Sequence, residues 1–92
     1  MEGIQVRVPP ALQYRTGGRR SVRVHAGTVR EMIDALERAY PGLHFNLCHE
    51  TGELRPYVNV FVSQENVRFL QGLDTPLAPG TTVHIIHSVA GG

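Results

Sequence analysis

The residues with the clearest chemical potential are the last two, Gly91 and Gly92, which closely follow a strand-like apolar run. Glycine has no side chain and free φ and ψ, so a tail ending this way can pass through a narrow channel into another protein's nucleotide site. A terminal carboxylate there can attack the α-phosphate of ATP with no Cβ in the way. The ending indicates a carboxylate that reacts on a partner, although a glycine end that merely frays has the same pattern.

The other reactive side chains form no recognisable site. His44, Cys48 and His49 are close in sequence, but a structural zinc site needs four ligands, so we expect no metal and a buried, apolar Cys48. No histidine accompanies a Ser or Cys nucleophile motif. Thr16-Gly17-Gly18 lacks the pattern and the lysine of a phosphate-binding loop, and the chain contains no lysine at all.

Composition limits the possible partners and compartments. Ninety-two residues, 41% apolar and 18% charged, suit one small globular domain. Nine arginines against eight acidic residues leave a formal charge of +1, so we expect no nucleic-acid partner. One cysteine excludes an internal disulfide and fits a reducing compartment. With no apolar run of about 18 residues and no signal-peptide pattern, we expect a cytoplasmic protein without a membrane partner.

Two strands and one helix are predicted in the first half of the chain. Residues 4–8 and 21–25 alternate apolar and polar side chains, which is typical of the strands of a hairpin. Thr28 and Glu31 have the spacing of a capping box, in which each side chain accepts the other residue's free backbone N–H. A helix that Pro41-Gly42 ends follows. Its apolar face consists of Val29, Ile33, Leu36 and Tyr40.

The second half of the chain predicts further strands. Residues 43–48 suggest one more helical turn, 57–62 a strand, 63–66 a polar turn, 67–70 a short strand, and 82–87 the last strand. The order β-β-α-β-(β)-β predicts an α+β fold of the β-grasp (ubiquitin-like) type, with a mixed sheet of four to five strands packed on one main helix. In that pattern the first and last strands are central, parallel neighbours. We place the domain at residues 1–87 and a flexible tail at 88–92.

The segment SVAGG at 88–92, after the strand VHIIH, resembles the C-terminus of the ThiS/MoaD-type sulfur carriers, and most closely their cysteine-biosynthesis branch. The likeness spans essentially the whole chain. Pro79-Gly80 departs from it at a turn where an acidic or Asn-Gly pair is more usual. The segments that support it are Thr16-Gly17-Gly18, YVNVFV at 57–62, ENVRF at 65–69 and LxxGTTV at 77–83.

This resemblance implies a protein co-substrate and not an enzyme. An E1-like activating enzyme would use ATP and Mg²⁺ to adenylate the Gly92 carboxylate, and a sulfur donor would then displace AMP to leave a thiocarboxylate. The carrier itself would bind no cofactor. The acceptor would resemble a PLP-dependent cysteine-synthase-type enzyme or another sulfur-accepting biosynthetic enzyme. The tail that enters its active site would be Val89, Ala90, Gly91 and Gly92.

Alternation also predicts a partner-binding surface. If Val83 and Ile85 face the core, Ile86 faces outward, and Tyr57 and Phe61 point away from the helix. Together Tyr57, Phe61 and Ile86 would form an exposed apolar patch beside the tail, unless loops cover them. The cluster Arg15, Arg19, Arg20 and Arg23 is expected to be a solvated loop, with contact to an acidic partner as the alternative.

Three other functions fit parts of the same pattern. The small subunit of a molybdopterin synthase uses the same tail but would co-purify with a large subunit. A ubiquitin-like modifier would form conjugates with lysines of other proteins, although its lack of lysine forbids chains of its own. A plain β-grasp binding module would not need Gly91 and Gly92.

Overall fold

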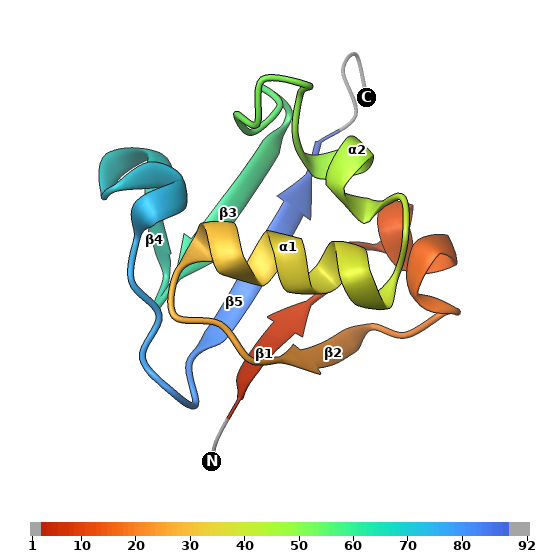
Figure 1. Cartoon of the computed structure of the whole chain (residues 1–92), viewed down its shortest axis with the longest axis horizontal. Coiled ribbons are helices and arrows are strands. Elements are labelled where there is room, and N and C mark those ends of the chain that lie inside the picture. Colours follow the sequence, from red (N-terminus) through yellow and green to blue (C-terminus); the bar gives the residue numbers. More distant parts are fainter. Residues whose placement is uncertain (1–2, 89–92) are drawn as a thin grey trace.

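The computed structural model of the chain describes residues 3–88. Five strands form one mixed sheet in the order β2-β1-β5-β3-β4, as Figure 1 shows. The strands are β1 (Ile4–Arg7), β2 (Ser21–Val24), β3 (Val58–Val62), β4 (Glu65–Asn66) and β5 (Thr82–His87). The helices are α1 (Val29–Ala39), α2 (Leu43–Leu47) and the 3-10 helices η1 (Pro10–Thr16), η2 (Val67–Phe69) and η3 (Gly72–Asp74).

The first and last strands are neighbours at the centre of the sheet. β1 runs parallel to β5, with Arg7 opposite His84, and antiparallel to β2. On its other side β5 pairs antiparallel with β3, which places His84 opposite Phe61 and Ile86 opposite Asn59. The predicted central, parallel pairing is therefore confirmed, and the strand that leads to the C-terminus is held from both sides.

The main helix begins as its cap predicts, with one difference. Thr28 Oγ1 accepts the Glu31 N–H at 3.2 Å, as expected of an N-cap. The Glu31 carboxylate, however, accepts the N–H of Gly27 at 2.8 Å, and not that of Thr28. The reciprocal half of the predicted capping box is therefore wrong by one residue, because Glu31 reaches back to the residue before the cap.

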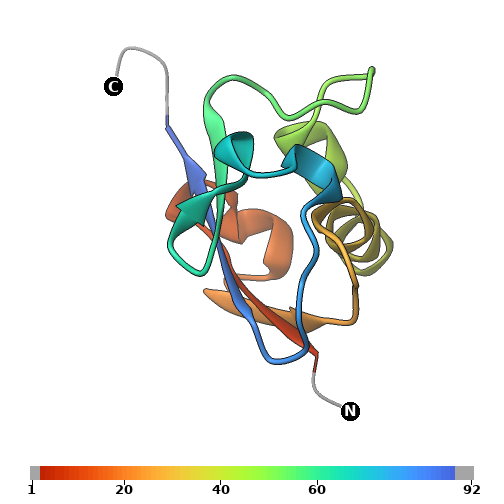
Figure 2. The ribbon, with the colours of Figure 1, turned by 90° about the vertical axis from the view of Figure 1, so that its left-hand side faces the viewer.

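One face of the sheet is covered and the other is open. α1 crosses the covered face (Figure 1), and the quarter turn of Figure 2 shows the described helices on that side of β1 and β5. The α1 residues against the sheet are Val29, Met32, Ile33 and Leu36, all buried. Tyr40, predicted to extend this stripe, lies half-buried at the helix C-cap. The alternating strands supply the other half of the core.

Two predictions between β3 and η3 were wrong. Residues 67–70 are not a strand: Val67–Phe69 is the 3-10 helix η2, because Asn66 Oδ1 accepts the Arg68 N–H at 2.9 Å and starts a helical turn. The strand is β4, inside the predicted polar turn. The turn itself is shorter and consists of Ser63 and Gln64, both with positive φ. The 3-10 helix η1 lies between β1 and β2, where the sequence predicted only a loop.

Candidate functional site

The candidate site is the end of β5, where the described chain leads into the tail. Ser88, the last described residue, donates its N–H to the Tyr57 carbonyl at 2.8 Å and extends the β5–β3 pairing by one position. The sheet therefore still holds Ser88, the first residue of the predicted 88–92 tail. The predicted tail residues Val89, Ala90, Gly91 and Gly92 lie outside the described residues.

The predicted alternation in β5 agrees with the structure. Val83 and Ile85 are buried in the core, whereas His84 and Ile86 are exposed on the open face of the sheet. Ile86 is 44% exposed. Phe61 on β3 lies diagonal to it, half-buried and directly opposite His84. Ile86 and Phe61 thus come from adjacent strands and lie next to His84.

Tyr57 is placed differently from the other two predicted docking residues. It precedes β3, packs against the hydrophobic core and is half-buried. Its ring meets the His87 ring edge-on, with the centroids 4.9 Å apart. Strand alternation therefore does not apply to it. Of the three predicted patch residues only Ile86 is exposed, whereas Tyr57 and Phe61 are half-buried. The exposed apolar surface is therefore smaller than the sequence predicted.

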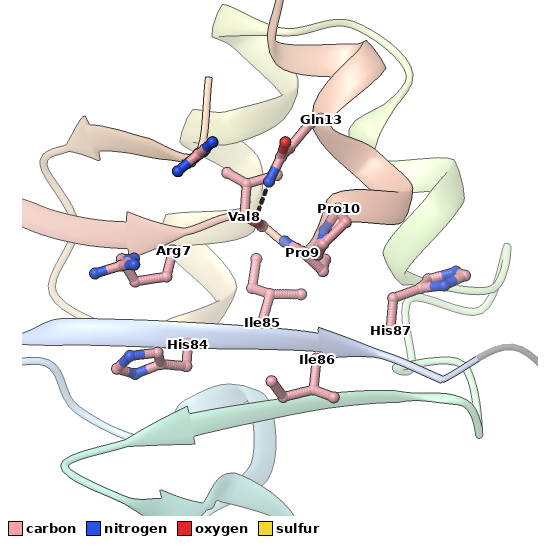
Figure 3. A pocket seen from close by; sticks show the side chains of 10 residues that line it. Arg7, Val8, Pro9, Pro10, Gln13, His84, Ile85, Ile86 and His87 are labelled. Atoms are coloured by element: carbon pink, nitrogen blue, oxygen red, sulfur yellow. Dashed lines mark hydrogen bonds between the residues drawn. The ribbon is translucent and has the colours of Figure 1, made fainter. Parts of the chain in front are cut away.

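A hollow of about 560 Å³ lies beside the end of β5, and we refer to it as the β5 hollow. Figure 3 shows its two walls, one from the end of β1 and the start of η1 and the other from the last residues of β5. Gln13 donates to the Val8 carbonyl at 3.2 Å and fixes the first wall. Its lining is Arg7, Val8, Pro9, Pro10, Gln13, Arg20, His84, Ile85, Ile86 and His87.

The other reactive side chains in the sequence are Cys48 and the possible metal ligands. Cys48 is buried, and this burial raises the pKa of its thiol, which agrees with the predicted apolar role. Within residues 3–88, no group of three or more His, Cys, Asp and Glu side chains could hold a metal ion. None of the helices in this same range is long and apolar enough to cross a membrane.

The apolar pattern alone missed part of this site. Arg7 ends β1 and Arg20 directly precedes β2, and both line the β5 hollow. The signal that could have found Arg7 is its place on the outward face of β1, next to the last strand. Arg15, by contrast, lies over the Tyr14 ring and donates to Asn46 at 2.9 Å, so the predicted arginine cluster does not act as one group.

Comparison with known proteins identifies the family of this chain. The profile of the ThiS family matches residues 6–92. The chain belongs to the ThiS family. Its β-grasp fold and its match to this family agree with the resemblance seen in the sequence.

Three relatives of this ThiS-family chain are informative. The sulfur carrier protein CysO of Mycobacterium tuberculosis is 38% identical over 91 residues, which cover 97% of this chain and 98% of CysO. Its crystal structure superposes with a TM-score of 0.88 at 36% identity, covering 94% and 99% of the two chains. A chain of the Amycolatopsis orientalis BexX/CysO complex reaches a TM-score of 0.90 at 38% identity, covering 97% and 99%. Small archaeal modifier protein 3 of Haloferax volcanii is 40% identical over 65 residues, 71% and 70% of the chains.

These relatives place the ThiS-family chain among small protein carriers and not among enzymes. They include sulfur carriers and a small archaeal modifier protein.

Proposed function

We propose that this protein carries sulfur as a thiocarboxylate on Gly92. The observation that supports this most directly is the family match, which runs through residue 92 on a chain 38% identical to CysO. In the first step the Gly92 carboxylate oxygen attacks the α-phosphate of ATP on an E1-like enzyme with Mg²⁺, and pyrophosphate leaves. A sulfur donor then attacks the acyl carbon, and AMP leaves with the electrons of the broken C–O bond.

Adenylation solves a specific chemical problem. A carboxylate is a poor electrophile, and attachment of AMP supplies a leaving group. The resulting thiocarboxylate sulfur is a nucleophile that stays bound to a protein until a partner's active site receives it. We propose as acceptor a biosynthetic enzyme of the PLP-dependent cysteine-synthase type, since this chain is 38% identical to the CysO carrier over 97% of its length.

The fold supports this role by presenting the tail from a central strand. Ser88 donates its N–H to the Tyr57 carbonyl, and Val89, Ala90, Gly91 and Gly92 follow it in the sequence. Four residues in an extended conformation reach about 13 Å, enough to bring a terminal group into a buried site while the folded domain stays outside. Ile86, beside this exit, would contact the partner together with Phe61.

The test is the intact mass of the protein after incubation with ATP, Mg²⁺, an E1-like activating enzyme and a sulfide source. Exchange of one oxygen for sulfur adds about 16 Da, which C-terminal fragmentation must place on Gly92 to exclude oxidation of Met32 or Cys48. The protein with Gly92 deleted is the control. No shift on Gly92 with an enzyme that demonstrably activates another carrier would contradict the proposal.

A second candidate function rests on the archaeal modifier. Its 40% identity over 65 residues favours, as an alternative, attachment of Gly92 to lysines of target proteins. Blotting of cell extracts for high-mass species that survive denaturation and thiols distinguishes this function. Conjugates lost on deletion of Gly92 would support the modifier, and their absence alongside a thiocarboxylated form would support the carrier.

A further inference from the structure

The β5 hollow exists because two neighbouring strands end at different heights. The β1–β5 ladder stops at the pair Arg7 and His84. Beyond it the chain turns away through Pro9, which has no N–H to continue a ladder, and enters η1. β5 continues to His87. Its last residues therefore border an open space on the side where β1 would otherwise lie (Figure 3).

Arginine and histidine side chains line this space, and no described carboxylate does. Arg7 approaches it from β1, Arg20 from the residues before β2, and His84 from β5. All three are exposed. Among residues 3–88 the structure forms a single salt bridge, between Arg30 and Asp74 on the helix-covered side. Arg7 and Arg20 thus have no carboxylate partner within the part of the chain that the structure describes.

The acidic residues lie elsewhere. The described acidic residues are Glu31, Asp34 and Glu37 on α1, Glu50 and Glu53 in the loop after α2, Glu65 on β4 and Asp74 on η3. None of the described carboxylates lines the β5 hollow. The hollow is therefore lined by two arginines and by no described carboxylate, which makes its rim locally cationic although the formal charge of the whole chain is only +1.

The surface of the hollow between Arg7 and Arg20 is largely apolar. Pro9 and Pro10 form one wall, and Ile86, the exposed predicted docking residue, forms part of the other. A space of about 560 Å³ with an apolar floor and guanidinium groups at its rim fits several side chains of a protein segment. Arginine forks pair with carboxylates in bidentate geometry, which makes acidic side chains the matching groups.

We propose that the β5 hollow receives an acidic segment of the protein that takes up the tail, with its carboxylates on Arg7 and Arg20 and an apolar residue against Ile86. The proposal rests on the proposed function for the identity of that protein, the E1-like activating enzyme. The location of the hollow explains how such a contact would help to deliver the tail. The hollow borders the last residues of β5, so a segment seated there holds the strand from which the tail departs and limits where the tail can point.

The experiment compares thiocarboxylation kinetics of wild-type protein and the double variant R7E/R20E, using the activating enzyme as the probe. Arg38→Glu, which reverses an exposed arginine on α1, is the matched control. At low ionic strength we expect the double variant to raise KM for the carrier about tenfold or more, with kcat unchanged. The difference should shrink at high salt, because exposed charges are screened. Arg38→Glu should stay within about twofold of wild type.

Three outcomes separate the proposals. Equal KM for R7E/R20E and wild type, or an equal increase for Arg38→Glu, would overturn the assignment of the hollow while the carrier chemistry stands. Absence of thiocarboxylation of the wild type would overturn the proposed function instead. Thermal unfolding of each variant checks the fold, and the neutral pair R7Q/R20Q, expected to show a smaller increase in KM, provides the same test if the reversed pair unfolds.

Discussion

The guanidinium of Arg68 donates to the carbonyl oxygen of Val58 at 2.7 Å, on the edge of β3 that β4 leaves uncovered. β4 pairs only with the last two residues of β3. The same guanidinium donates to the Arg55 carbonyl at 2.8 Å and to Asn59 Oδ1 at 3.2 Å. The Arg68 side chain thereby satisfies the Val58 carbonyl, which a longer β4 could have bonded, and it covers this edge against pairing with another chain.

Replacing Arg68 should therefore destabilise the fold although the residue is exposed. We expect Arg68→Ala to lower the free energy of unfolding by about 1–3 kcal/mol, because several charge-assisted hydrogen bonds are lost. Arg68→Lys should recover only part of this, since an ammonium cannot reproduce the planar fork. Urea denaturation measures both, with Arg38→Ala as the exposed-arginine control. Equal stability of Arg68→Ala and that control would contradict the edge role.

Glu37 should make stability depend on pH. Its carboxylate accepts the His44 N–H at 2.9 Å and the Gly42 N–H at 3.1 Å, and these bonds hold its pKa below the ordinary 4.5. A lowered pKa in the folded state stabilises the fold above the unfolded-state pKa, and this contribution is lost as pH falls through the folded-state pKa. The stability difference between wild type and Glu37→Gln should thus be present at pH 7 and decline toward pH 3.

The measurement is the urea midpoint as a function of pH. Glu50→Gln provides a matched change, because Glu50 is exposed and accepts no hydrogen bond from the described residues. Its difference from wild type should vary less over the same range. A Glu37→Gln difference that persists undiminished at pH 3 would mean that the charge of Glu37 contributes nothing to stability.

Gly42 and Gly52 offer a paired test of backbone strain and close contact. Both have left-handed φ values, 104° and 94°. A Cβ on Gly42 would lie 2.6 Å from Arg15 Nη1, whereas one on Gly52 would meet nothing within 4 Å. We expect Gly52→Ala to cost about 1–2 kcal/mol from the strained φ alone, and Gly42→Ala to cost more. If both cost the same in thermal unfolding, the Arg15 side chain has simply moved.

Ile86→Asn should weaken partner binding without affecting the fold. Ile86 is exposed, so its removal costs little core packing, while a contact with the activating enzyme would lose its apolar side chain. We expect a several-fold higher KM in thiocarboxylation and an unchanged thermal midpoint. Phe69→Asn, which removes an even more exposed apolar residue on η2, is the control. A wild-type KM for Ile86→Asn would remove Ile86 from the docking surface.

Local patterns predicted the parts of the fold whose side chains repeat regularly. The alternation of Val58, Val60 and Val62 and the stripe along α1 each depend on one period. Both sets are buried as expected, except for the half-buried Tyr40 at the end of the stripe. η2 was missed because an Asn66 side chain, and not a hydrophobic period, starts it. η1 was missed because Leu12 is buried against residues distant in sequence.

The candidate site was predictable only in part for the same reason. The outward direction of Ile86 follows from alternation within β5 alone. The orientation of Tyr57 depends on where β3 begins, and that strand begins one residue later than predicted, at Val58. The β5 hollow needs the end of β1, the start of η1 and the end of β5 together. No single stretch of sequence contains that information.

The parallel pairing of β1 with β5 also bears on when the tail becomes usable. Its partners come from opposite ends of the chain, so this ladder closes a very long loop and is costly to nucleate during folding. β5 lies between β1 and β3, so its full pairing requires both neighbours to be in place. A chain in which β5 has not yet paired would lack the β5 hollow, and the end of β5 would not be held in place by the sheet. If the tail is activated as proposed, we expect an incompletely folded chain to be a poor substrate for that step.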